Sequence, residues 1–340
     1  MKIRYLAILL AVCWVSAPLA TLADDTVNLY SARNEALIAP LLERFTEETG
    51  IQVRLLTARA DALLQRLQSE GINSPADVLL TVDAGNLHRA KEAGLIRPLD
   101  SATLRAAVPE TYRDPEGHWV GLSMRARPIM YVKDKIDPDQ LSSYEQLTDP
   151  AWRGKICIRS SDNIYNQSMV ASMIAEHGED ATEAWVMGLV ANMARPPRGG
   201  DRDQIKAAAA GQCDLAIANT YYLAGMLTDN DPAERQPAQA IGVFWPNQED
   251  RGVHVNVSGA ALTQSAKNEA AAIRLIEFLV SPESQAWYAE VNGEYPVREG
   301  TPISSVLEQW GTFKADSLNL AQLGELNAAA VRLMDRAGWR

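Results

Sequence analysis

Short apolar runs alternate with amphipathic stretches along most of this 340-residue chain, and this alternation constrains the fold more than any other feature. Residues 36–49, for example, carry leucines at helical spacing and end at Gly50. This alternation of strands and helices predicts an α/β fold whose parallel sheet is covered by helices on both faces. The expected strands are residues 27–31, 51–56, 77–82, 129–132, 155–159, 214–218, 241–245 and 253–257.

The alternation forms two successive series, and a chain of this length suggests about two domains. Residues 120–127 lead into the strand at 129–132, which we interpret as the first crossing between domains. The strands at 241–245 and 253–257 bring the chain back. We therefore expect a first α/β lobe from residues 24–124 and 252–302, and a second from residues 125–251 and 303–340.

The first 23 residues have the pattern of a signal peptide. Lys2 and Arg4 precede an apolar run, residues 6–15, that is too short to span a bilayer. Small residues follow, and Ala23 ends a plausible cleavage site, so the mature chain is predicted to begin at Asp24. No other segment is apolar enough to cross a membrane. The sequence thus predicts an exported protein.

The net charge limits the classes of binding partner, and the cysteines suggest a disulfide. The formal net charge of the chain is −11, which argues against nucleic-acid binding because phosphates require a basic surface. Cys157 and Cys213 each flank a predicted strand. Oxidising conditions outside the cytoplasm allow such a pair to form a disulfide, which we predict here. Two free buried thiols are the alternative.

The common catalytic signatures are absent from the sequence. It contains no glycine-rich nucleotide loop, no nucleophile elbow and no His-Glu-x-x-His motif. The four histidines are scattered and lack the spacing of a zinc site. The many carboxylates are explained by an acidic surface. A secreted enzyme that uses Asp83 or Glu35 as a base is therefore a weak alternative.

Polar corners follow four of the predicted strands, at residues 31–35, 83, 160–165 and 219–222. In open α/β sheets, ligands bind beyond the carboxyl ends of the strands, so these corners can converge on one cleft. The candidate oxygen ligands are Tyr165, Tyr221, Tyr222, Asp83 and Glu35, and the candidate anion-binding residues are Arg33, Arg125 and Arg127.

Phenols without a histidine or cysteine cluster suggest a particular cargo. A phenol has a pKa of about 10, so only a strongly acidic cation holds it deprotonated at neutral pH. Ferric iron is such a cation, and it prefers anionic oxygen. A sugar-binding cleft, in which the tyrosines stack on the ligand, is the alternative. A Tyr-Tyr pair taken alone most often marks an ordinary surface.

The sequence resembles the periplasmic ferric-iron-binding proteins that serve ABC importers, within the wider extracellular solute-binding proteins. The resemblance covers nearly the whole mature chain. It is carried by residues 27–33 (VNLYSAR), 77–85 (DVLLTVDAG), 121–127 (GLSMRAR), 159–168 (RSSDNIYNQS) and 218–222 (ANTYY). It implies two α/β lobes joined by a hinge of crossing strands that close on the ligand.

The resemblance also implies roles for individual residues. Tyr165, Tyr221 and Tyr222 are expected to bind Fe(3+), and Arg125 and Arg33 to hold a synergistic anion such as carbonate. The chain departs from the family pattern at Asn34 and Glu35, where many relatives carry His, or His followed by Tyr. Glu35, Asp83 or the anion is expected to complete the iron shell, and Asn34 and Ser161 are further candidates for contact with the anion.

The sequence therefore predicts a periplasmic, monomeric binding protein that captures ferric iron and delivers it to the permease of an ABC importer in the inner membrane. One alternative keeps the binding role but replaces iron with a small organic anion, such as a phosphonate or carboxylate, held by Arg33 and Arg125.

Overall fold

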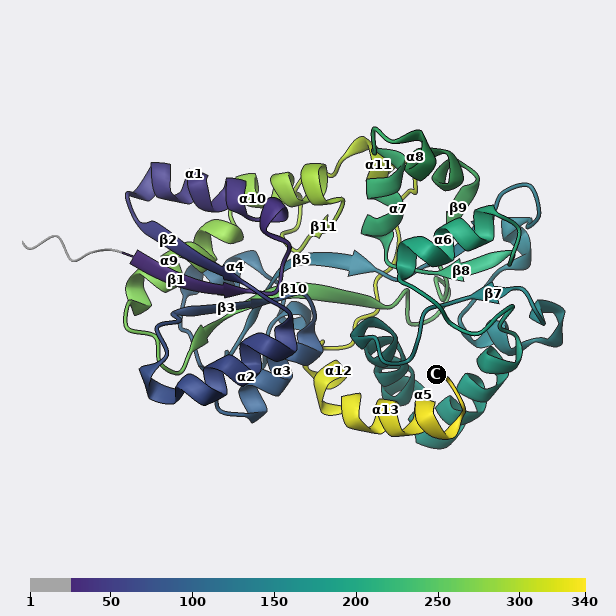
Figure 1. The fold of residues 1–340 in the computed structure, drawn as a ribbon, viewed down its shortest axis with the longest axis horizontal. Helices are drawn as coiled ribbons and strands as arrows, with labels where there is room; N and C mark the ends of the chain where they lie inside the picture. The colour runs from purple at the N-terminus through teal and green to yellow at the C-terminus, as the bar shows by residue number, and fades with distance from the viewer. Residues whose placement is uncertain (1–25) are drawn as a thin grey trace, which may run out of the picture.

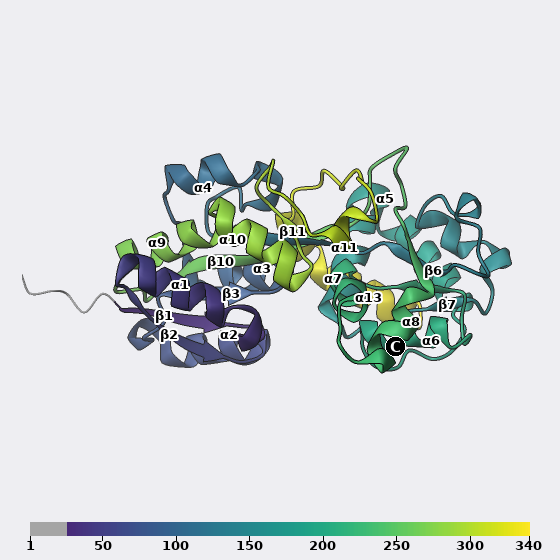
Figure 2. The ribbon, with the colours of Figure 1, turned by 90° about the horizontal axis from the view of Figure 1, so that it is seen from above.

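The computed structural model describes residues 26–340, and the predicted signal peptide lies outside these residues. Two lobes lie side by side (Figures 1 and 2). Each is built around its own sheet, so we call them the first lobe, which contains the N-terminal strands, and the second lobe. Between residues 26 and 340, no helix is both long enough and apolar enough to span a membrane.

The sheet of the first lobe is mixed, not parallel as predicted. Strands β1, β2 and β3 are parallel, but β10 pairs antiparallel with β3, β4 and β5, and β11 pairs antiparallel with β5. The reason is that β10 enters from the second lobe and runs between β3 and β5 in the opposite direction. The strands are β1 (Thr26–Ser31), β2 (Gln52–Thr57), β3 (Val78–Thr81), β4 (Ile96–Arg97), β5 (Val120–Ala126), β10 (Val255–Thr263) and β11 (Tyr295–Pro296).

The sheet of the second lobe has the strand order β7-β8-β6-β9. Only β7 and β8 are parallel, because β6 and β9 form an antiparallel pair beside them. These strands are β6 (Ile129–Val132), β7 (Ile156–Cys157), β8 (Leu215–Ile217) and β9 (Ile241–Phe244). The starts of α5 and α7 follow β7 and β8, so the parallel pair places two helix N-termini at one edge of the sheet.

Helices cover both sheets, and their apolar faces fill the core. In α1 the buried residues are Leu41, Leu42 and Phe45, and the helix ends at Gly50, whose φ of 76° is left-handed. The α-helices are α1 (Ala39–Thr49), α2 (Ala60–Glu70), α3 (Ala84–Glu92), α4 (Ala102–Ala107), α5 (Ile164–Ala191), α6 (Asp201–Ala209), α7 (Thr220–Leu227), α8 (Pro232–Gln239), α9 (Glu269–Leu279), α10 (Pro282–Trp287), α11 (Ser305–Glu308), α12 (Ala321–Glu325) and α13 (Asn327–Arg336).

Short helical turns join these elements. They are η1 (Glu35–Leu37), η2 (Gly71–Asn73), η3 (Glu110–Tyr112), η4 (Pro138–Gln140), η5 (Glu145–Thr148), η6 (Pro150–Trp152) and the π-helical η7 (Tyr288–Asn292). The long element α5 is interrupted at Gly178 by a non-helical φ of 78°, so it consists of two helical segments that meet at this glycine.

Two of the segments that cross between the lobes are joined by one tyrosine. β5 leads into β6, and β9 leads into β10. At the crossing, the Arg127 amide donates to the His254 carbonyl at 3.0 Å. The Tyr144 hydroxyl donates to the Arg127 carbonyl at 2.7 Å and accepts from the His254 amide at 3.2 Å. We propose this crossing as the hinge, and we keep the predicted lobe boundaries near residues 124, 251 and 302 as a proposal.

The C-terminal helices bridge the two lobes beside the cleft. α12 contacts α3 of the first lobe, and α13 packs along α5 of the second (Figure 1). Gly324 of α12 lies so close to the His88 side chain that an added Cβ would overlap it. The C-terminal segment therefore belongs to both lobes by contact, whereas the sequence assigned it to the second lobe alone.

The predicted disulfide is confirmed, since Cys157 and Cys213 are bonded in the second lobe. It joins β7 to the turn that precedes β8, across a sequence separation of 56 residues. Replacing both cysteines by alanine is expected to lower the free energy of unfolding by about 2–5 kcal/mol, because the crosslink restricts the unfolded chain. Thermal unfolding with and without a reductant measures this cost. Equal melting temperatures of the double variant and the oxidised wild type would contradict it.

Candidate metal centre

Three phenols gather at the starts of two helices in the second lobe. Tyr165 is the second residue of α5, and Tyr221 and Tyr222 are the second and third residues of α7. The Tyr221 hydroxyl donates to the Tyr165 hydroxyl at 3.2 Å. The ring centroids of Tyr221 and Tyr222 lie 4.3 Å apart. The structure thus brings together the three tyrosines that the sequence singled out.

Local sequence explains why the phenols share this corner. Asn163 caps α5, and its side-chain oxygen accepts from the Tyr165 amide at 3.0 Å. Asn219 is the extended residue that precedes α7, with φ −71° and ψ 143°. Each helix therefore begins immediately after a polar residue, and its first turn places the phenols beyond the edge of the sheet.

Burial makes the iron-free phenols hard to ionise. Burial and the neighbouring Tyr222 raise the pKa of Tyr165 to about 12, although the charge of Arg125 opposes the rise. Burial also raises the pKa of Tyr221 well above its ordinary value, and Tyr165 adds to the effect. Tyr165 and Tyr221 are consequently neutral at neutral pH, and a bound cation must displace their protons.

Arg125 is the arginine of the first lobe that reaches the phenols. It lies in β5, is 2% exposed, and its guanidinium carbon is 5.5 Å from the centre of the Tyr165 ring. Nη1 donates to Ser258 at 2.9 Å, whereas Nε and Nη2 have no hydrogen-bond partner among the described residues. Buried guanidinium nitrogens without partners are a suitable place for an anion.

Arg33 is less available to an anion than the sequence suggested. Its Nη2 donates to Glu294 at 2.8 Å and to Ser123 at 3.0 Å, and both arginine and glutamate are buried. Its guanidinium also lies over the Tyr288 ring, 5.4 Å from the centroid. Glu294 was not among the predicted site residues, because it lies far along the chain, directly before β11, where the sequence gives no sign of the pairing.

Asp83 is buried and hydrogen-bonded outside the phenol cluster. As the cap of α3 it accepts from Gly85 at 2.7 Å, and Ser168 and Asn256 also donate to it. Burial raises its pKa to about 6 despite the nearby charge of Arg125, whose Nη2 is 3.9 Å away. Asp83 therefore lies behind Arg125, as its counter-ion, and connects the first lobe to α5 through Ser168.

The remaining predicted residues are exposed or form contacts elsewhere. Asn34 and Glu35 are exposed, and the Asn34 side chain accepts from the Ala36 amide at 3.0 Å as the cap of η1. The Ser161 hydroxyl donates to the Trp339 carbonyl at 2.7 Å. Arg127 is buried in an ion pair with Asp201 at 2.9 Å. None of these side chains contacts a phenol through a hydrogen bond among residues 26–340.

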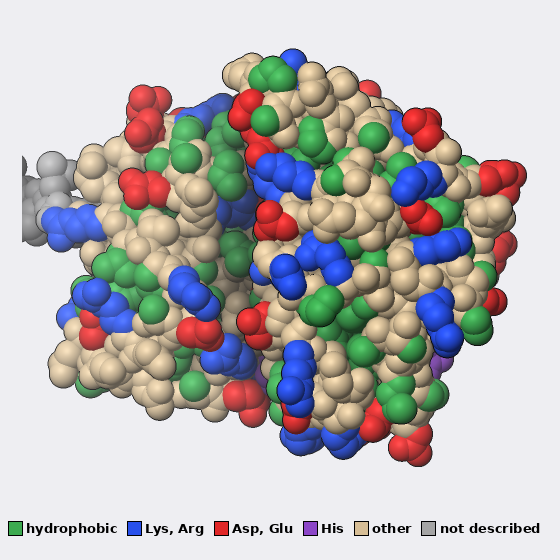
Figure 3. Space-filling model, turned by 45° about the vertical axis from the view of Figure 1, so that its right-hand side comes forward, with side chains coloured by type: hydrophobic (Ala, Val, Ile, Leu, Met, Phe, Trp, Pro, Cys, Tyr) green, Lys and Arg blue, Asp and Glu red, His purple; other side chains and the backbone are tan. Residues whose placement is uncertain are grey.

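A cleft opens between the lobes next to this cluster. It has a volume of about 1300 Å³ and lies between α2 and α3 on one side and the start of α5 with α12 and α13 on the other. Asn163 and Ile164, which directly precede Tyr165, line it. The space-filling view shows the hollow between the lobes, with basic side chains along the edge of the second lobe (Figure 3). The cleft therefore reaches the residues directly before Tyr165, whereas none of the three tyrosines lines it.

Comparison with known proteins identifies the family. Residues 73–315 match the family described as bacterial extracellular solute-binding protein. The chain belongs to this family. Its relatives include Iron uptake protein A1 of Synechocystis, which is 48% identical over 98% of this chain and 93% of its own length.

Solved structures of relatives share the fold across nearly the whole chain. FutA (IdiA) of Trichodesmium, in complex with iron and citrate, superposes with a TM-score of 0.91 at 50% identity, covering 93% of this chain and all of its own. The Bordetella ferric binding protein superposes with a TM-score of 0.86 at 42% identity, covering 92% of this chain and 99% of its own. The two-lobe α/β fold class predicted from the sequence is confirmed.

Proposed function

We propose that this protein captures ferric iron in the periplasm and delivers it to the permease of an ABC importer. The observation that carries the proposal is the cluster of Tyr165, Tyr221 and Tyr222 at two helix starts beside an interlobe cleft. Among the described residues, no group of three or more His, Cys, Asp or Glu side chains is arranged to hold a metal ion. Phenolate oxygen is thus the ligand type that the second lobe offers.

The relatives support the same cargo. Iron uptake proteins A1 and A2 of Synechocystis are 48% and 46% identical to this chain, and the Trichodesmium structure contains iron. An organic anion as the only cargo is not favoured. A base-catalysed reaction at Asp83 is also disfavoured, because its carboxylate is fully buried and accepts hydrogen bonds from three residues.

We propose that capture proceeds by closure of the lobes on the ion. The phenol oxygens of the second lobe replace water on the iron and lose their protons. Arg125 then holds a synergistic anion from the side of the first lobe, because its Nε and Nη2 have no hydrogen-bond partner among the described residues and Asp83, its counter-ion, lies 3.9 Å from Nη2. Carbonate is one candidate, and citrate is another, since it accompanies iron in the Trichodesmium relative.

The first lobe offers one further ligand for the ion. Glu35 is exposed on η1, directly after the corner that follows β1, whereas Asp83 is enclosed by its hydrogen-bond donors. We therefore propose Glu35, rather than Asp83, as the carboxylate that completes the iron shell on closure. In this proposal the anion held by Arg125 supplies oxygen to the iron in addition to the three phenols and Glu35.

A colour test decides the proposed function. The mature protein, freed of iron, is mixed with ferric citrate in one sample and with ferric nitrilotriacetate plus bicarbonate in another. A visible charge-transfer band from tyrosinate to iron is expected at one iron per protein. The absence of iron binding in both samples would overturn the proposal. A band in only one of the two samples would identify the preferred anion.

A further inference from the structure

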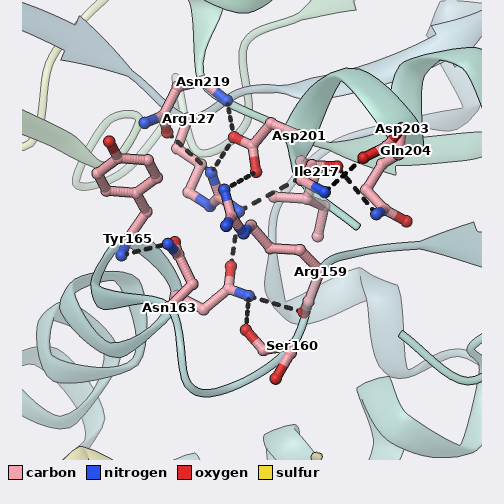
Figure 4. Close-up of polar contacts among 12 residues, drawn as sticks. Arg127, Arg159, Ser160, Asn163, Tyr165, Asp201, Asp203, Gln204, Ile217 and Asn219 are labelled. Carbon is pink, nitrogen blue, oxygen red and sulfur yellow. Dashed lines mark hydrogen bonds and ion pairs between the residues drawn. The ribbon is translucent and has the colours of Figure 1, made fainter. Parts of the chain in front are cut away.

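One guanidinium group lies beneath the phenol cluster and contacts both helices that carry it. Arg127 is 1% exposed. Its Nη1 donates to Asp201 at 2.9 Å and to Asn219 at 2.8 Å, and its Nη2 donates to Asn166 at 2.6 Å (Figure 4). Arg127 therefore binds three side chains from three separate segments of the second lobe.

Each of these partners sits at the start of a helix. Asn166 follows Tyr165 directly in α5, and Asn219 precedes α7, two residues before Tyr221. Asp201 is the first residue of α6, and it also accepts from the Asn219 backbone amide at 2.8 Å. The planar fork of Arg127 thus fixes the spacing between the two helix starts.

The loop that leads into α5 is fixed by the same network. The Asn166 side-chain nitrogen donates to the carbonyls of Arg159 and Ser160 at 2.9 and 3.0 Å. Arg159 in turn lies 3.4 Å from Asp201, and its guanidinium carbon is 5.8 Å from the centre of the Tyr165 ring (Figure 4). Asp201 is therefore enclosed between two arginines and is not available to coordinate an ion.

We propose that Arg127 and Asp201 are positioning residues, which hold the Tyr165 phenol at the correct distance from Tyr221 and Tyr222 for one metal ion. The proposal rests on the proposed function for the identity of the cargo. A buried ion pair is weak evidence for stability, because desolvation offsets its attraction. Partners that orient metal ligands, in contrast, commonly change metal affinity 10–100-fold when they are removed.

Arg127→Met tests the proposal, with Arg251→Met as a matched control. Arg251 is also buried, and its Nη1 forms an ion pair with Asp316 at 2.9 Å, away from the starts of α5 and α7. Ferric affinity is measured by competition with nitrilotriacetate in the presence of bicarbonate, well below the melting temperature of each variant. Arg127→Met is expected to lose about 10–100-fold in affinity and to give a weaker or shifted charge-transfer band, whereas Arg251→Met keeps both.

A conservative substitution, Arg127→Lys, separates the positioning role from a purely structural role. Arg127→Lys keeps the charge but lacks the planar fork that reaches three partners, so it is expected to recover the fold and only part of the affinity. Native affinity and an unchanged band in folded Arg127→Met would overturn the proposal. An equal loss in Arg251→Met would overturn it as well.

Two further measurements keep the test decisive. If Arg127→Met does not fold, Asn166→Ala replaces it, since it removes one partner of the guanidinium; unchanged affinity and band would then overturn the proposal, and a loss of about tenfold would support it. If the wild type binds no iron, the proposed function fails separately. A crystal structure of the iron-free variant then decides, because the 3.2 Å contact between Tyr165 and Tyr221 is expected to be lost, and its persistence would overturn the positioning role.

Discussion

Tyr221→Phe is expected to reduce ferric-iron affinity by more than about 100-fold, beyond the 10–100-fold that is typical of a lost outer-shell partner. Tyr221 lies between the other two phenols, since its hydroxyl contacts Tyr165 and its ring contacts Tyr222. Removing the Tyr221 oxygen takes away one of the three proposed phenol ligands and the hydrogen bond to Tyr165. Competition with a ferric chelator and the intensity of the charge-transfer band measure the loss.

The fold should survive this substitution, because only one part-buried hydrogen bond between phenols is removed, a loss of about 1 kcal/mol. Tyr295→Phe is the matched control. The Tyr295 hydroxyl is buried in the first lobe and has no hydrogen-bond partner among the described residues, so its removal changes the tyrosine count without touching the site. Iron binding by Tyr221→Phe at the strength of Tyr295→Phe would show that Tyr221 is not a ligand.

Iron affinity is expected to fall steeply as the pH falls. The raised pKa values of Tyr165, about 12, and of Tyr221 mean that both phenols carry protons in the iron-free protein at neutral pH. Each phenol that becomes a ligand must release its proton, so a lower pH opposes binding. Each proton released lowers the affinity about tenfold per pH unit, so the protons of Tyr165 and Tyr221 alone account for a drop of about 100-fold per unit.

Proton counting measures this coupling directly. Ferric chelate is added to iron-free protein in a weakly buffered solution, and the base needed to hold the pH constant gives the protons released. The wild type is expected to release one more proton than Tyr221→Phe. Equal release by both proteins, or affinity that is independent of pH between about 5.5 and 7.5, would contradict ligation by phenolate.

The alternation of strands and helices was visible in the sequence because it depends on local patterns. The apolar stripe of α1, the glycine that ends it and the cap at Asp83 all act within a few residues. The direction of β10 was not visible. Its pairing with β3 and β5 depends on where the chain returns from the second lobe, which no local pattern specifies.

The candidate site was predictable in part for the same reason. Tyr165, Tyr221 and Tyr222 follow strands, and chain order alone places such corners at one edge of a sheet. Which arginine remains open to an anion was not predictable. Arg33 is hydrogen-bonded through Nη2 to Glu294, which is 261 residues further along the chain, whereas Nη2 of Arg125 has no hydrogen-bond partner among residues 26–340. Asp201 resembled an ordinary first-turn acid of α6, and only its burial beside Arg127 distinguishes it.

The sequence by itself determined the two-lobe α/β class, the disulfide pair and the three phenols, because each follows from residue type and spacing within short segments. The tertiary structure alone decided which charges neutralise each other and which groups are buried. Those properties arise from contacts between segments that are distant in the chain. Burial disfavours the charged form of a group and thereby shifts its pKa. The result is a cluster of three phenols beside the buried Arg125 and Arg127, and the raised pKa of Tyr165 is the reason why we expect iron binding there to release protons.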